Sequence, residues 1–198
     1  MGNTYLYEYG GSLYINLTSK CSNDCIFCLR NGTDGVGGET LWLDREPEAG
    51  EVIAALSACD LAAYKETVFC GFGEPTYRMD ALVEIGRFLR GAGKYVRLDT
   101  NGQGCLINGY DITPCLSGAV DFVSVSLNNA NTAAYNKNCN SIYANAYEQL
   151  LEFAKKCKEQ GIRVQFSVVD IIPPDEIERC REIAKKMGAE FKLRSLWR

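Results

Sequence analysis

The chain has 198 residues, a formal net charge of -4 and no dense block of lysine and arginine. The acidic balance argues against general binding to nucleic-acid phosphates, and no stretch approaches the roughly 20 apolar residues of a membrane span. Ten cysteines occur and no histidine, which excludes imidazole chemistry and every Ser-His or Cys-His catalytic pair. Because the N-terminus lacks a signal pattern, we expect a cytoplasmic protein. In that compartment the ten cysteines are expected to be reduced thiols and metal ligands rather than disulfides.

Short β-type runs alternate with helical stretches about six times along the chain. The strands are expected near residues 12–18, 66–71, 95–100, 121–128, 162–169 and 190–196. This order predicts parallel strands, and a complete eight-unit βα barrel takes about 250 residues. Residues 1–198 are therefore expected to form one α/β domain, a partial, open TIM-like barrel of about six units.

Polar residues alternate with apolar ones in these strands, where a closed barrel would pack layers of Val, Ile and Leu. In the fourth strand, Ser124, Ser126 and Asn128 are expected to share one face. The corresponding polar positions of the first, third and fifth strands are Tyr14, Asn16, Thr18, Arg97, Asp99, Gln165 and Ser167. A polar lumen implies a ligand cavity. The alternative is a hydrogen-bonded polar layer inside an ordinary core.

Three cysteines follow the first strand on one tight loop. Cys21, Cys25 and Cys28 have the spacing C-x3-C-x2-C. A cubane cluster has four irons, so three thiolates leave one iron open to a small molecule, and Phe27 would shield the cluster from water. Structural zinc, a disulfide and three unrelated thiols are the alternatives. Zinc normally takes four ligands, and no fourth cysteine lies close in sequence.

Two glycine-rich segments invite comparison with phosphate loops. The segment 71–76, Gly-Phe-Gly-Glu-Pro-Thr, follows the second strand. Pro75 has no N-H to donate and Glu74 would repel a pyrophosphate, so the sequence disfavours phosphate binding there. The stretch Gly35–Gly38 is expected to be a flexible loop over the site rather than a phosphate loop.

These motifs together resemble the radical S-adenosylmethionine (SAM) superfamily. The cysteine spacing with an aromatic residue before the last cysteine matches its cluster motif, and residues 71–76 resemble its SAM-binding GGE-type motif. Residues 99–102, Asp-Thr-Asn-Gly, resemble a segment common in activase-like members. More narrowly, residues 16–18, the loop 30–42 and residues 124–128 resemble the small TatD-associated radical SAM proteins.

The resemblance implies an enzyme that holds a 4Fe-4S cluster through Cys21, Cys25 and Cys28 and binds SAM at the open iron. One electron then cleaves SAM to methionine and a 5'-deoxyadenosyl radical, which removes hydrogen from a substrate. A carboxylate and exposed carbonyls in the turn of Glu74 suit the ammonium group of SAM. The implied SAM-binding residues are Gly71, Gly73, Glu74, Asp99, Asn101, Ser124, Ser126 and Asn128.

Two further roles follow from the same comparison. Asp99 and Thr100 resemble a monovalent-cation site of activase-like relatives, but Ser126 stands where those relatives carry an aspartate. The cation is therefore disfavoured here. Arg97 and Gln165 are candidates for contacts to a carboxylate or to the substrate, with a structural role as the alternative for each.

The other cysteines divide into two groups. Those expected in the core, on or beside apolar helical stripes, are Cys59, Cys157 and Cys180. Cys105, Cys115 and Cys139 fall in or near loops on the barrel face where active sites form. Scattered spacing disfavours a second cluster built from these three, and a single catalytic thiol at Cys139 is the better hypothesis.

The leading functional prediction is a radical SAM enzyme that acts on a bulky substrate, such as a peptide, protein or nucleic acid, that closes the open barrel. A low-potential flavodoxin or ferredoxin is the expected electron donor, because the reduction needs the low end of the cluster range. Two alternatives stay open. One is an activase that installs a glycyl radical on a partner enzyme, and the other is a noncatalytic iron-sulfur or zinc module that binds no SAM.

Overall fold

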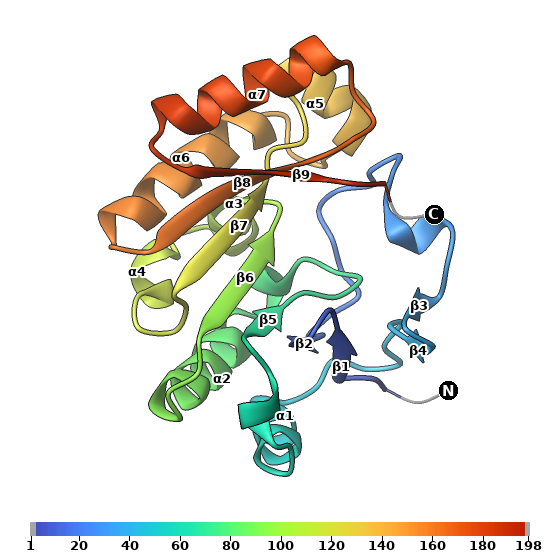
Figure 1. Ribbon diagram of the computed structural model, residues 1–198, viewed down its shortest axis with the longest axis vertical. Helices are drawn as coiled ribbons and strands as arrows, with labels where there is room; N and C mark the ends of the chain where they lie inside the picture. The colour runs from blue at the N-terminus through green and yellow to red at the C-terminus, as the bar shows by residue number, and fades with distance from the viewer. Residues whose placement is uncertain (1–2, 197–198) are drawn as a thin grey trace.

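The computed structural model describes residues 3–196 and is drawn in Figure 1. Its main element is a seven-stranded sheet in the order β1-β2-β5-β6-β7-β8-β9. The strands of this sheet are β1 (Leu6–Tyr9), β2 (Ser12–Ile15), β5 (Thr67–Phe69), β6 (Val96–Thr100), β7 (Phe122–Ser126), β8 (Arg163–Val169) and β9 (Glu190–Arg194). The strands from β2 to β9 pair in parallel, whereas β1 pairs with β2 in antiparallel fashion. The α/β class and the partial parallel barrel are therefore confirmed.

Helices connect the parallel strands. The α-helices are α1 (Ala49–Ser57), α2 (Met79–Gly91), α3 (Gly104–Asn108), α4 (Thr113–Leu116), α5 (Thr132–Cys139), α6 (Ala146–Glu159) and α7 (Pro174–Lys186). The 3-10 helices are η1 (Leu29–Asn31), η2 (Leu61–Ala63) and η3 (Pro75–Arg78). In Figure 1, α2, α4 and α6 lie along one side of the sheet, and the segment between β2 and α1 lies on the other side. Within residues 3–196, no helix is long and apolar enough to cross a membrane.

Alternation along the strands decides which side of the sheet meets the helices. In β6, Val96, Leu98 and Thr100 are buried, whereas Arg97 and Asp99 are only partly buried. The apolar stripe of α2, which includes Leu82, Ile85 and Leu89, belongs to the same core cluster as the outward-facing strand residues. Burial of this apolar surface is the main stabilising term for the sheet-helix layer.

The opposite face of the sheet is polar, as the alternation predicts. Pairing registers place Asp99 beside Ser124, Ser124 beside Gln165, and Ser126 beside Ser167, so these side chains share one face. Near β6 part of this face is internally satisfied, because Arg97 pairs with Glu66 at 3.1 Å and with Asp99 at 3.0 Å. Around Arg97 the polar face is therefore held mainly by ion pairs.

Three local expectations need correction. Strand β7 ends at Ser126, and Asn128 lies beyond it with φ = 56°, so Asn128 does not continue the serine face. Residues 35–38 are not a plain flexible loop, because β3 (Gly35–Val36) and β4 (Glu39–Thr40) form a short hairpin there. Strand β1 was not expected. It is joined to β2 through Gly10 and Gly11, both at positive φ, where glycine adopts the turn without strain.

Gly73 allows a close approach of two backbone segments. A Cβ atom at this position would lie 2.3 Å from the Thr18 carbonyl oxygen and 2.5 Å from the Lys20 carbonyl oxygen. We expect Gly73→Ala to lower the free energy of unfolding by about 2–4 kcal/mol, because neither backbone can move away cheaply. Urea unfolding monitored by circular dichroism measures this change.

The matched control is Gly91→Ala at the end of α2, where an added Cβ meets nothing within 4 Å. Alanine there is expected to raise stability by up to about 1 kcal/mol, since glycine is the poorer helix former. Equal stability of the two variants would show that Gly73 is not held in close contact.

Candidate active site

The candidate site lies where the carboxyl ends of four neighbouring parallel strands meet. Residues 16–28 follow β2, residues 70–76 follow β5, residues 101–103 follow β6 and residues 127–129 follow β7. Active sites of parallel α/β proteins form at this edge, because the loops that leave adjacent strands converge there. The cysteine loop and the turn of Glu74 are joined directly, since the backbone N-H of Glu74 donates to the Lys20 carbonyl at 2.8 Å.

All three cysteines of the C-x3-C-x2-C motif are free thiols and partly buried. The Cys28 backbone N-H donates to the Cys25 carbonyl at 3.0 Å, which closes the loop, and the Cys25 thiol points toward the Cys139 carbonyl at 3.7 Å. Burial raises the pKa of Cys21 to about 12, helped by the nearby charge of Glu74. The pKa of Cys25 is also raised, mainly by its contact with the Cys139 thiol and by burial.

A polar network that sequence reasoning missed holds the cysteine loop in place. Gln103 accepts from Ser22 Oγ at 2.7 Å and donates to Asn23 Oδ1 at 2.7 Å and to Tyr135 OH at 3.0 Å. Asn101 Nδ2 also donates to Ser22 Oγ at 2.9 Å. Ser22 and Asn23 occupy the variable positions of the cysteine motif, so nothing in their spacing signals this role. Their partners lie about 80–110 residues further along the chain.

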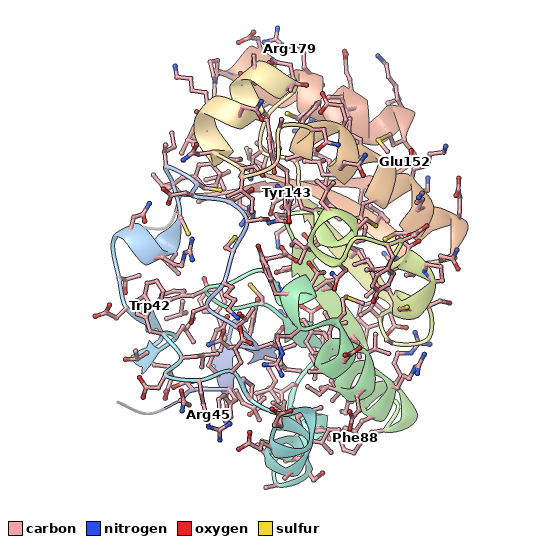
Figure 2. All side chains as sticks on the ribbon, turned by 180° about the vertical axis from the view of Figure 1, so that it is seen from behind. Trp42, Arg45, Phe88, Tyr143, Glu152 and Arg179 are labelled. Carbon is pink, nitrogen blue, oxygen red and sulfur yellow. The ribbon has the colours of Figure 1, made fainter. Side chains whose placement is uncertain are left out.

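The segment after α5 completes the cradle for the loop. Backbone N-H groups of Asp24 and Ile26 donate to the carbonyls of Cys139 and Asn138 at 3.1 and 3.0 Å. The Ile142 N-H donates to the Ser22 carbonyl at 2.9 Å. Figure 2 shows Tyr143 in this segment, close to the ribbon that carries the cysteine loop.

Arg30 is the second feature that sequence reasoning did not single out. Its guanidinium donates to the carbonyls of Ser19 at 3.2 Å and of Asn23 at 3.3 Å, and it stacks over Trp42 at 5.9 Å. Burial works to lower the pKa of Arg30, but the nearby Cys28 and Cys21 thiols raise it overall. A permanent positive charge therefore lies beside two thiols of the motif.

Glu74 is 3% exposed, and its carboxylate points into the protein. One oxygen accepts from Thr76 N at 3.2 Å, Thr76 Oγ1 at 2.7 Å and Thr100 Oγ1 at 2.7 Å, and the other accepts from Asn101 N at 2.7 Å. Burial raises the pKa of Glu74, against these hydrogen bonds, which lower it. This differs from the expected direct contact with an ammonium group, because the carboxylate is fully used in tying three segments together.

The remaining predicted SAM residues have separate surroundings. Gly71 packs against Asn16, so closely that a Cβ atom would lie 2.0 Å from Asn16 Oδ1. Ser124 is buried and Ser126 is partly buried on the polar face. Asp99 pairs with Arg97, and poor solvation raises its pKa although Arg97, Arg194 and Lys192 act to lower it. Asp99 thus belongs to the ion pairs of the polar face.

Asn128 and Cys139 contact each other. Asn128 Nδ2 lies 3.7 Å from Cys139 Sγ, and Cys139 is the last residue of α5 with no exposed surface. The hypothesis of a catalytic thiol at Cys139 is not supported, because a nucleophilic or hydrogen-donating thiol needs access to the substrate. The structure instead packs Cys139 against the cysteine loop, where it supports Cys25.

The other cysteines do not gather into a second cluster. Cys105 lies on α3 and approaches Asp111 Oδ1 at 3.8 Å, whereas Cys115 lies on α4. Cys157 and Cys180 are fully buried, which confirms their core assignment. Cys59, expected in the core, is only partly buried at the end of α1, and its thiol donates to the Ala55 carbonyl at 3.3 Å.

No group of three or more Cys, Asp or Glu side chains among residues 3–196 is arranged to hold a metal ion. The Cys25 thiol points toward the Cys139 carbonyl. The donor set nevertheless fits an iron-sulfur cluster. It offers three free thiols on one anchored loop beside a positive charge.

Comparison with known proteins agrees with this geometry. A family model described as the Radical SAM superfamily matches residues 15–187. Over 183 residues the chain is 25% identical to a probable GTP 3',8-cyclase of Methanothermobacter thermautotrophicus, which covers 92% of this chain and 56% of that protein. Among solved structures, Streptococcus suis SuiB bound to S-adenosylmethionine has a TM-score of 0.74 at 14% identity, covering 96% of this chain and 41% of SuiB. Methylornithine synthase (PylB) has a TM-score of 0.61 at 12% identity, covering 94% and 53%.

The fold and the site define an α/β protein with a partial parallel barrel and a thiol-rich loop at its carboxyl edge. The chain belongs to the Radical SAM superfamily, and it is an enzyme of that family. The family uses a 4Fe-4S cluster and SAM, which are therefore the cofactors of this chain. The TatD-associated subgroup is not confirmed. The chain spans about half the length of the curated relative it matches.

Proposed function

We propose that this chain cleaves SAM reductively at a 4Fe-4S cluster held by Cys21, Cys25 and Cys28, and removes hydrogen from a macromolecular substrate. The observation that carries the proposal is the direct join between the cysteine loop and the 71–76 turn, made by the Glu74 N-H and the Lys20 carbonyl. A loop with three free thiols and an adjacent turn with available carbonyls are the two parts that a cluster-bound SAM requires.

The chain's own residues position the cofactors. Glu74 fixes the 71–76 turn through its four hydrogen bonds, so that contacts to the ammonium group of SAM fall to the backbone carbonyls of the turn. Asn101 fixes Ser22 and so orients the cysteine loop, and Ser124 and Ser126 offer hydroxyls for the ribose or the carboxylate. When bound, the cluster and SAM supply the electron transfer and the deoxyadenosyl radical chemistry.

A bulky substrate is supported by β9, the edge strand of the sheet within residues 3–196. Strand β9 is the last strand in the sheet order. Leu193 in this strand and Leu196 just after it are 42% and 37% exposed. An open edge with exposed apolar side chains is typical of a surface that a partner covers. A low-potential flavodoxin or ferredoxin remains the proposed donor.

The structure disfavours the alternative of an activase that installs a glycyl radical. Asp99 is engaged by Arg97 and does not offer a free carboxylate for a cation. The noncatalytic zinc or iron-sulfur module would need a fourth protein ligand. The further cysteine whose thiol contacts the loop, at Cys25, is Cys139, which is buried at the end of α5.

The test is electron paramagnetic resonance of the anaerobically purified, reconstituted and dithionite-reduced protein, before and after addition of SAM. We expect a reduced-cluster signal that changes when SAM binds, together with formation of 5'-deoxyadenosine. Bound zinc, or a cluster signal indifferent to SAM, would contradict the proposal and favour the noncatalytic module.

A further inference from the structure

Two cations of β9 lie on the polar face of the sheet without a partner of their own. Pairing registers place Lys192 beside Ser167 and Arg194 beside Val169, which puts both on the face that carries Ser167 and Gln165. Within the described residues, neither side chain takes part in a hydrogen bond or ion pair, and Arg194 Nε is buried without an acceptor. A buried guanidinium donor without an acceptor is unfavourable, so its presence points to a group that arrives from outside the chain.

The surroundings of Arg194 show where such a group would lie. The positive charge of Arg194 acts on Asp99 in β6 and on the Cys70 thiol after β5, so it lies within electrostatic reach of both. Lys192 acts on Asp99 as well. Cys70 directly precedes the 71–76 turn, and the cations of β9 therefore border the proposed SAM site across the polar face.

The internal anions do not satisfy Arg194. The nearby carboxylate of Asp99 is taken by Arg97, which also holds Glu66. Arg194 thus keeps a planar fork of N-H donors, the geometry that binds a carboxylate or phosphate through two parallel hydrogen bonds. Lys192, exposed two residues earlier on the same face, adds a second positive charge.

We propose that Arg194 and Lys192 form an anion subsite that holds a carboxylate or phosphate group of the substrate. The inference rests on the proposed function, because it gives the substrate a place beside the SAM site. It makes the substrate class an acidic one, such as a carboxylate-bearing side chain or a phosphate ester, anchored at β9 while the reacting carbon faces the 71–76 turn.

The experiment measures thermal unfolding of the cluster-loaded protein with SAM, without oxygen, as inorganic phosphate or succinate replaces chloride at constant ionic strength. Binding to the folded state raises the unfolding midpoint, by about 2–5 °C at tenfold excess over Kd. We expect this rise in the unmodified protein and its loss in Arg194→Gln and Lys192→Gln. The matched controls Arg87→Gln on α2 and Lys185→Gln on α7 remove exposed cations elsewhere and should keep the full rise.

Three results would overturn the subsite. One is the absence of any rise in the unmodified protein, and another is an undiminished rise in Arg194→Gln. The third is loss of the SAM-induced change of the cluster signal in Arg194→Gln, which would assign the cation to the carboxylate of SAM instead. Failure of the proposed function is distinguishable, because it removes the SAM response from the unmodified protein whether or not the anions bind.

Discussion

Cys25→Ala is expected to abolish reductive cleavage of SAM, lowering 5'-deoxyadenosine formation by more than about a hundredfold. Loss of even an outer-shell partner of a metal ligand costs ten- to a hundredfold, and loss of one of three cluster ligands removes more. Iron content, the reduced-cluster signal and deoxyadenosine yield measure the effect.

Cys59→Ala is the matched control for Cys25→Ala. Cys59 is also a free, partly buried thiol, but it lies just after α1 and its thiol donates to the Ala55 carbonyl of that helix. We expect unchanged iron content and unchanged SAM cleavage. If Cys25→Ala retained a SAM-responsive cluster while Cys59→Ala lost it, the assignment of the cluster loop would be wrong.

Glu74→Ala is expected to cause the largest loss of stability among single substitutions outside the apolar core, about 3–5 kcal/mol. Removing the carboxylate leaves the buried donors of Thr76, Thr100 and Asn101 without their acceptor. It also unties the 71–76 turn from the end of β6, so SAM binding should weaken along with stability. Urea unfolding of the metal-free, reduced protein gives the change in free energy.

Glu84→Ala on the exposed side of α2 is the control, with an expected change within about 0.5 kcal/mol.

Glu74→Gln adds a test of the pH dependence of stability. Because burial raises the folded-state pKa of Glu74 above its ordinary value of 4.5, the folded protein holds this proton more tightly than the unfolded chain. The contribution of Glu74 to the free energy of unfolding therefore falls as the pH rises above 4.5. The advantage of the unmodified protein over Glu74→Gln should shrink over that range, and an advantage that grows with pH would contradict the raised pKa.

Much of the architecture follows from local patterns. The alternation of short apolar strands with helical stretches predicted six parallel strands, and each is present within a few residues of its expected position. The antiparallel strand β1 was missed because four residues are too few to show the alternation typical of a strand. This segment becomes a strand by pairing with β2. The polar face was predicted correctly in β6 to β8, where alternation alone decides which side chains point inward.

Side-chain roles were harder to predict than strands. Glu74 was expected to face a ligand, but the turn directs its carboxylate inward to donors that come from η3 and the end of β6. Asn128 was expected on the serine face, but the chain turns after Ser126 and brings it to Cys139 instead. In both cases the residue type was informative, and the direction of the side chain depended on a backbone turn that composition does not specify.

The sequence by itself determined the family, the cofactors and the parallel order of the strands, because cysteine spacing and hydrophobic alternation are local properties of the chain. Only the tertiary structure decided what surrounds the cysteine loop. Gln103, Asn101 and Tyr135 reach it through contacts that no local spacing encodes, and the charge of Arg194 acts on Asp99 only across the polar face of the sheet. The physical reason is that charges and hydrogen bonds act over a few ångströms in space, whatever the separation along the chain.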